Sequence, residues 1–192
     1  MGRFGRKLYY AAVVLMIGAG FGAGPAWAAP PPGLLGKSTV LRWAEDWMVR
    51  PVGTVAFRSF TQTVTFTTYV STAGRIFSRQ QRAGSGSNVR RLAGRSSTAE
   101  HVPGGGLATG VKMGRTDFRG NQMIYSVRYE SGARQIVVTF TAGFSSCSAD
   151  VIHGREGGQR QKLHSDVTGE WVEVGSVKVR EVQCSVSEGP AF

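Results

Sequence analysis

Two cysteines and three histidines are the residues of this 192-residue chain whose side chains most readily do chemistry. Cys147 and Cys184 lie 37 positions apart, without the Cys-x-x-Cys spacing of a metal site or a redox motif. In a secreted chain two such cysteines most simply form one disulfide, while two buried free thiols or a reactive pair are the alternatives. We therefore expect a Cys147–Cys184 disulfide.

The histidines form no recognisable catalytic or metal-binding motif. His101, His153 and His164 lack the HxxxH and HExxH spacings of metal sites. The serines around Cys147 are not part of a Gly-x-Ser-x-Gly elbow. We expect no metal, no cofactor and no enzymatic activity.

Glu45 is the one acidic residue that shares a face with Trp43 and Trp47 if residues 37–50 form a strand. In a β-barrel this face could point inward and line a ligand pocket made by Trp43, Glu45 and Trp47. A helix over the same residues is the alternative, with Glu45 on a solvated face. We favour the strand, because Pro51-Val52-Gly53 ends it in a β context and no capping box precedes it.

Positive charge is concentrated in one part of the chain. Between Asp46 and Glu100 there is no acidic residue but there are eight arginines. Arginine binds phosphate and carboxylate through paired hydrogen bonds, so this pattern is typical of a surface that attracts polyanions. The alternative is that the charge only keeps the protein soluble. The residues that we expect to bind the anion are Arg75, Arg79, Arg90 and Arg91.

Residues 1–28 have the pattern of a secretory signal peptide. Positive residues precede an apolar core over 8–19, which is shorter than a membrane span needs, and Ala26-Trp27-Ala28 fits a cleavage site. An uncleaved anchor helix is the alternative. Cleavage would remove three positive charges, lower the net charge from +11 to +8 and leave no transmembrane segment. We therefore expect a periplasmic or secreted protein.

The rest of the chain predicts a single all-β domain over 37–192, preceded by a proline-rich extended lead-in over 29–36. The strongest strand signal lies in 133–153, which we interpret as a central hairpin that the disulfide ties to the last strand. Segment 80–97 is rich in Gly, Ser, Arg and Gln and predicts a long mobile loop.

Eight to nine short strands separated by glycine turns predict an antiparallel meander. Such a meander closes as a small barrel or folds into a two-sheet sandwich. In the last strand the apolar alternation changes phase between Val179 and Val182. This change predicts a β-bulge near Arg180–Glu181.

Four segments taken together resemble a group of small uncharacterised secreted β-rich proteins of α-proteobacteria. The resemblance covers most of the chain after residue 28, and the group has no assigned activity. It implies periplasmic export and paired cysteines, and it implies no site residues. The segments are Gly36-Lys37-Ser38, Tyr69-Val70-Ser71-Thr72-Ala73-Gly74-Arg75-Ile76-Phe77, Ala142-Gly143-Phe144-Ser145-Ser146-Cys147-Ser148-Ala149 and Gln183-Cys184-Ser185-Val186.

These observations favour an exported, non-enzymatic binding or structural module of the cell envelope. Its expected partner is an anionic polysaccharide or the phosphate of lipopolysaccharide, and export argues against nucleic acid. The alternative function is a small-molecule carrier with an apolar pocket inside a β-barrel.

Overall fold

The computed structural model describes residues 29–85, 92–101, 114–129, 132–154, 162–165 and 170–191. Within these ranges the chain forms one 3-10 turn and ten strands. The elements are η1 (Pro32–Leu34), β1 (Lys37–Pro51), β2 (Arg58–Val70), β3 (Ile76–Ser85), β4 (Leu92–His101), β5 (Gly114–Arg119), β6 (Gln122–Tyr129), β7 (Gly132–Phe140), β8 (Cys147–Gly154), β9 (Lys162–Ser165) and β10 (Glu170–Glu188).

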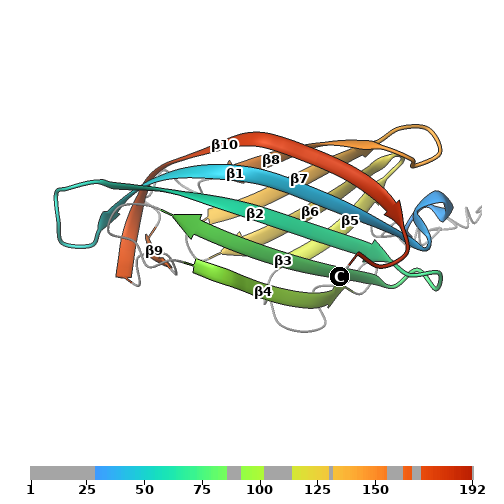
Figure 1. The fold of residues 1–192 in the computed structure, drawn as a ribbon, viewed down its shortest axis with the longest axis horizontal. Helices are drawn as coiled ribbons and strands as arrows, with labels where there is room; N and C mark the ends of the chain where they lie inside the picture. Colours follow the sequence, from blue (N-terminus) through green and yellow to red (C-terminus); the bar gives the residue numbers. More distant parts are fainter. Residues whose placement is uncertain are drawn as a thin grey trace, which may run out of the picture.

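The strands form two antiparallel sheets, which confirms the all-β prediction and favours the sandwich over the barrel. One sheet has the strand order β4-β3-β2-β1-β10-β9, and the other has the order β5-β6-β7-β8. Figure 1 shows the smaller sheet lying behind the larger one, with its strands crossing those of the larger sheet. Because β1 pairs with both β2 and β10, the first and last strands lie together in the middle of the larger sheet.

β1 confirms the strand prediction for residues 37–50 and the face that it assigned. Leu41, Trp43, Glu45 and Val49 are buried, while Arg42 between them is exposed. This alternation follows from the period of two of a pleated strand with one face on the core. Glu45 therefore lies on the same inner face as the two tryptophans.

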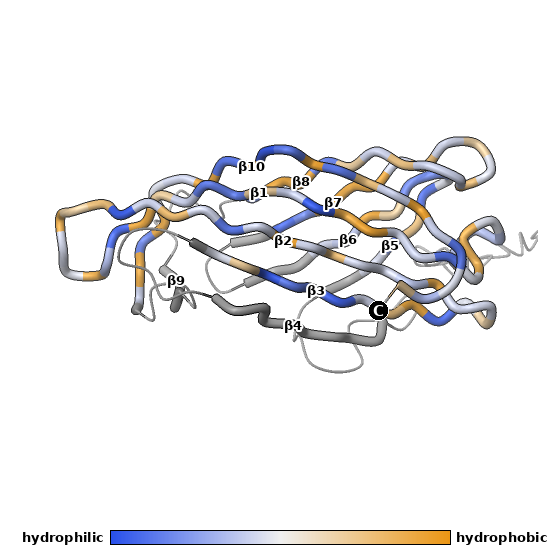
Figure 2. The backbone as a smooth tube through the Cα atoms, in the orientation of Figure 1, coloured by the Kyte–Doolittle hydropathy of each residue, from blue (hydrophilic) through white to orange (hydrophobic). Residues whose placement is uncertain are grey.

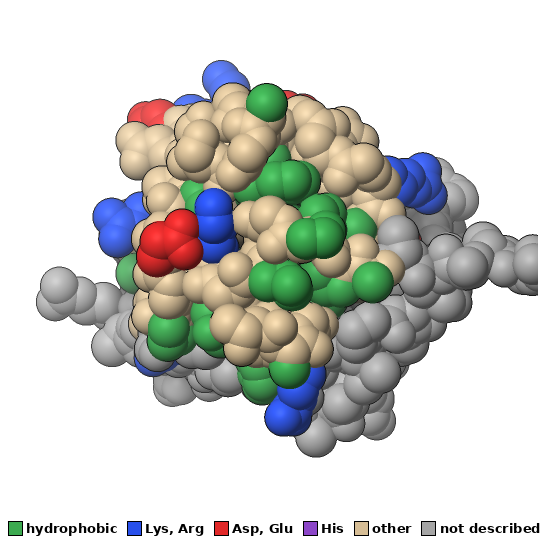
Figure 3. Space-filling model, turned by 90° about the vertical axis from the view of Figure 1, so that its right-hand side faces the viewer, with side chains coloured by type: hydrophobic (Ala, Val, Ile, Leu, Met, Phe, Trp, Pro, Cys, Tyr) green, Lys and Arg blue, Asp and Glu red, His purple; other side chains and the backbone are tan. Residues whose placement is uncertain are grey.

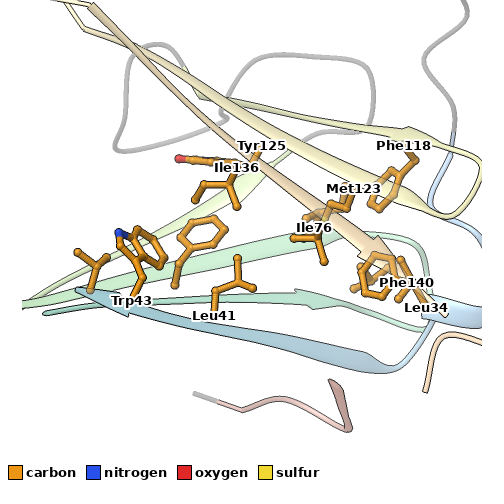
Figure 4. Packing of buried hydrophobic residues seen from close by; sticks show 13 residues of the cluster. Leu34, Leu41, Trp43, Ile76, Phe118, Met123, Tyr125, Ile136 and Phe140 are labelled. Carbon is orange, nitrogen blue, oxygen red and sulfur yellow. The ribbon is translucent and has the colours of Figure 1, made fainter. Parts of the chain in front are cut away.

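The main core lies between the two sheets (Figure 4). Leu41 and Trp43 of β1 approach Tyr125 of β6 and Ile136 of β7 from the opposite sheet. Burying an aliphatic or aromatic side chain of this size contributes about 1.5–3 kcal/mol relative to leaving it exposed. The other members of the cluster are Leu34, Val64, Phe66, Val70, Ile76, Phe118, Met123, Val138 and Phe140.

The predicted central hairpin and its disulfide are both present. β7 and β8 pair along their length, and Cys147 at the start of β8 is bonded to Cys184 of β10 with a Cα–Cα distance of 5.5 Å. β8 is an edge strand of the smaller sheet. Among the described residues, β10 pairs around Cys184 with β1 alone, so the disulfide joins the edge strand β8 to an outer part of the larger sheet.

The predicted bulge in β10 is confirmed. The register of β1 and β10 shifts opposite Trp43, and Glu181 has a positive φ of 57°. The extra residue brings Val179 before the bulge and Val182 after it to the same face of the sheet, where both pack against the core. The change of phase in the sequence therefore reflects one extra residue in β10.

The mobile loop predicted over 80–97 is wrong for much of its length. Residues 80–85 belong to β3 and residues 92–97 belong to β4, and the two strands pair from Ile76↔His101 to Gly84↔Leu92. Backbone hydrogen bonds hold this hairpin at the side of the larger sheet, and they form whatever the side chains are. Composition indicated a loop because the hairpin has few apolar residues. Residues 86–91 lie outside the described residues.

The extended lead-in predicted over 29–36 contains η1, which is a turn of 3-10 helix. Proline suits the first residues of a helical turn, because its φ is already fixed near the helical value. The turn places Leu34 in the core at 1% exposure. It also brings Gly33 so close to the ring of Phe144 that a Cβ on residue 33 would clash with it. Figure 3 shows hydrophobic side chains gathered on the end of the molecule that lies at the right of Figure 1.

Candidate functional site

A polar cluster centred on Glu45 interrupts the apolar interior between the sheets. Trp43, Glu45 and Trp47 alternate along the inner face of β1, and the Glu45 side chain is fully buried. Gln62 of β2 lies directly opposite Glu45 in the register of the two strands. The larger sheet thus supplies the carboxylate and three of the side chains that contact it.

Both carboxylate oxygens of Glu45 accept hydrogen bonds from within the larger sheet. Nε1 of Trp43 donates to Oε1 at 2.7 Å, and Nε1 of Trp47 donates to Oε2 at 2.9 Å. Nε2 of Gln62 also donates to Oε2. A buried carboxylate is tolerated only when its charge and lone pairs are satisfied in this way.

The smaller sheet supplies the opposite charge. Arg134 of β7 and His153 of β8 are cross-strand partners, so their side chains reach the carboxylate side by side. Nη2 of Arg134 lies 3.2 Å from Oε1 of Glu45, and Nε2 of His153 lies 3.1 Å from the same oxygen. The rings of His153 and Trp47 are also nearly perpendicular, with centroids 5.8 Å apart. Glu45 therefore joins the two sheets through polar contacts.

These partners decide the charge of Glu45. Burial alone would raise the pKa of its carboxyl group, but the charge of Arg134 and the hydrogen bonds from His153 and Trp43 act in the other direction. The net result is a pKa held well below its ordinary range. Glu45 is thus ionised in the folded protein and is not available as a proton donor near neutral pH.

Arg134 is nearly as buried as the carboxylate, at 5% exposure. Its Nη2 contacts Glu45, while Nε and Nη1 are buried with no hydrogen-bond acceptor among the described residues. The guanidinium lies over the ring of Trp43, 5.9 Å from its centroid. A cation stacked on an indole is favourable when it is desolvated, so Trp43 contacts both members of the ion pair.

The sequence placed Trp43, Glu45 and Trp47 together, and the structure does bring them together. Their polar atoms contact one another, Gln62 and the smaller sheet, and Trp43 and Glu45 are almost fully buried. Sequence reasoning missed the other members of the cluster. For two of them the alternation of inward and outward residues was an available signal. Arg134 lies two residues before the inward-facing Ile136, and His153 lies two residues after Val151.

The predicted anion-binding arginines lie elsewhere. Arg75 precedes β3 and Arg79 lies on it, with the parity of Phe77, so all three belong to the outer face of the larger sheet. The guanidinium of Arg75 lies 5.4 Å from the centroid of the Phe77 ring, and that ring stacks on Tyr69 of β2 with centroids 6.4 Å apart. Arg90 and Arg91 lie outside the described residues.

The lowered pKa of Glu45 predicts how stability depends on pH. The carboxyl group is ionised more readily in the folded than in the unfolded chain, whose pKa lies near about 4.3. Its stabilising contribution is therefore complete above that value and is lost as the pH falls toward the folded pKa. The free energy of unfolding should fall more steeply from about pH 5 to about pH 3 in the wild type than in Glu45→Gln.

Chemical denaturation at a series of pH values measures this difference. Asp46, whose pKa is also lowered by its hydrogen bond with Arg180, is present in both proteins and cancels in the comparison. Parallel pH curves for the two proteins would show that Glu45 does not titrate differently in the two states.

Comparison with known protein families, with curated proteins and with solved structures gives no match for this chain. Within the described ranges no three His, Cys, Asp or Glu side chains are grouped so that they could hold a metal ion. No helix in the described part of the chain has the length and apolar character that crossing a membrane requires.

Proposed function

We propose that this protein is an exported, non-enzymatic module of the cell envelope that binds an anionic glycan. The binding surface is the outer face of β2 and β3, which we call the arginine–aromatic face: Tyr69, Arg75, Phe77 and Arg79. The observation that carries the proposal is the continuous stack in which Arg75 lies over Phe77 and Phe77 lies on Tyr69. This arrangement places cationic and aromatic surface side by side on one face.

The chemistry of the arginine–aromatic face suits a sugar that bears phosphate or carboxylate groups. The aromatic rings offer flat apolar surface to the C–H face of a sugar, and the guanidinium groups donate paired hydrogen bonds to an anion. β2 and β3 contain no Asp or Glu, so no carboxylate on either strand opposes the approach of an anion. Arg42 is exposed on the outer face of the neighbouring strand β1 and extends the positive surface.

Two further observations support export and a binding role. The Cys147–Cys184 disulfide is compatible with an oxidising compartment, as the signal pattern over 1–28 predicts. The ionised, fully buried Glu45 is engaged by Trp43, Trp47, Gln62, Arg134 and His153, which suits a structural role better than proton transfer. Among the described residues no contact favours the carrier alternative, because the predicted pocket residues contact one another and the facing sheet.

Retention on immobilised heparin or lipopolysaccharide at increasing salt tests this proposal. The affinity of the wild type should fall as salt rises, because binding to a polyanion releases counterions. Arg75→Gln/Arg79→Gln should lower the affinity at low salt at least about tenfold and reduce the slope of log affinity against log salt by about one to two. Retention that does not change with salt would contradict the proposal.

The matched control removes the same charge from other surfaces. Arg119 lies at the end of β5 in the smaller sheet, and Lys178 lies on β10, and both are exposed. Arg119→Gln/Lys178→Gln should retain most of the affinity. Equal losses in the two double variants would mean that only the overall charge matters and that the arginine–aromatic face is not the site.

A further inference from the structure

The loop between β1 and β2 carries apolar side chains into solvent at one end of the molecule. It forms the narrow projection at the left of Figure 1, and Figure 2 shows hydrophobic segments along it. Val55 is 89% exposed, Phe57 is 53% exposed and Val52 is 45% exposed. Trp171 at the start of β10 is 57% exposed and adjoins the loop, because its backbone oxygen accepts a hydrogen bond from Val52 N at 3.0 Å.

This apolar tip, defined as Val52, Val55, Phe57 and Trp171, is held in place by its backbone. Thr54 N and Oγ1 both donate to the backbone oxygen of Pro51, at 3.1 and 2.9 Å, and Gly53 supplies the positive φ of 85° that the turn needs. The tip therefore displays its apolar groups in a preformed turn, which reduces the entropy that binding would cost.

The Phe57 ring is supported from below. A Cβ at Gly175 would lie only 2.8 Å from Cε1 of Phe57, so the ring rests directly on the backbone of β10. The guanidinium of Arg50, which is paired with Glu173, lies 5.6 Å from the ring centroid. Phe57 is held in place by these contacts and is still 53% exposed.

The shape and chemistry of the tip favour a lipid surface over a protein partner. A stable protein interface buries about 800 Å² on each side, which is more than a six-residue loop and one tryptophan can supply. A bilayer accepts a narrow apolar projection, and tryptophan prefers the level of the lipid headgroups. The net charge of the chain is +11, or +8 without residues 1–28, so the surface that complements it is anionic.

We propose that the apolar tip inserts into the headgroup region of an anionic lipid leaflet. Val55 and Phe57 would enter the apolar side of that region, and Trp171 would lie at its level. Arg50, which is paired with Glu173, precedes the loop on β1, and Arg58 follows it on β2. Both guanidinium groups would lie toward the lipid phosphates. The tip is at one end of β2 and Arg75 follows the other end, so lipid insertion does not depend on glycan binding by the arginine–aromatic face.

Sedimentation with vesicles tests the insertion, using protein in its natural processed form. Vesicles of phosphatidylcholine alone are compared with vesicles of equal parts phosphatidylglycerol and phosphatidylcholine. The wild type should partition more strongly into the mixed vesicles. Val55→Ser/Phe57→Ser should lower that partition at least about tenfold, because two apolar side chains no longer leave water. Val55→Ser alone, at a position almost fully exposed, should lower it several-fold without affecting folding.

Two controls separate insertion from general stickiness and from the glycan site. Ile152→Ser removes an exposed apolar side chain of β8 and should leave partition unchanged. Arg75→Gln/Arg79→Gln should keep most of the partition while losing heparin retention. Phospholipid brominated in its acyl chains should quench the tryptophan fluorescence of the wild type, and Trp171→Phe should lose that quenching. The inference is overturned by equal partition into the two kinds of vesicle, by no partition at all, or by equal losses in Ile152→Ser and Val55→Ser.

Discussion

Replacing Arg134 by methionine is expected to lower the free energy of unfolding by about 3–5 kcal/mol. The substitution leaves the fully buried carboxylate of Glu45 without the positive charge that lies 3.2 Å from it. The hydrogen bonds from its other partners remain, that from His153 among them, but without the charge of Arg134 they do not offset the desolvation of the carboxylate. Urea denaturation at neutral pH, with the disulfide intact, measures the loss.

A second substitution distinguishes a lost charge pair from a simple packing defect. Glu45→Gln/Arg134→Met has no buried charge in the pair, and the new amide keeps one oxygen that can accept from Trp43. The double variant should therefore be more stable than Arg134→Met by at least about 1 kcal/mol. If the double variant is less stable than Arg134→Met, the damage comes from lost packing.

Gln135→Met is the matched control for Arg134→Met. Gln135 is the next residue of β7, and its side chain is exposed on the other face of the strand. A surface substitution of this kind changes stability by at most about 0.5 kcal/mol. A similar loss in both variants would point to the strand and not to the ion pair.

The sequence could predict those features of the Glu45 cluster that depend on neighbouring residues, but not contacts between distant strands. The inner face of β1 follows from local alternation, so Trp43, Glu45 and Trp47 could be placed on one side without any knowledge of the other strands. The same local alternation located the bulge at Glu181, because Val179 and Val182 cannot share a face without an extra residue.

The partners of Glu45 could not be predicted in the same way. Parity indicates that Arg134 and His153 point inward, but not that they meet Glu45, because that contact depends on how one sheet crosses the other. A charged residue at a position that should face the core also indicates, from sequence alone, that the strand has ended. Here Arg134 lies two residues before Ile136 and stays buried because Glu45 neutralises it.

The hairpin of β3 and β4 shows the opposite limit. Its composition predicted a loop because it has few apolar residues. Even its inner face carries Gln80 and Arg82, which are only half-buried. The strands form because β2 offers a complete row of backbone partners from Thr61 to Val70. A strand at the side of a sheet needs fewer apolar side chains than one at its centre, so composition alone underestimates it.

Replacing both Cys147 and Cys184 by alanine is expected to lower the free energy of unfolding by about 3–4 kcal/mol. The bond closes a loop of 37 residues, and its removal allows the unfolded chain more conformations. The loss is also local, because β8 is an edge strand of the smaller sheet and the disulfide ties it to β10. In the cysteine-free protein the amide hydrogens of β8 should gain more in exchange rate than those of β1 and β2. Each of those two strands is paired with a neighbour on both sides.

The comparison with Ser185→Ala makes the test specific. Ser185 adjoins Cys184 on β10, and its side chain is exposed. That variant should unfold within about 0.5 kcal/mol of the wild type. If the cysteine-free protein were equally stable, the Glu45–Arg134 contact and the shared core would suffice to hold the sheets together. If exchange rose equally in every strand, the disulfide would act on the unfolded chain alone and would not protect the edge at β8.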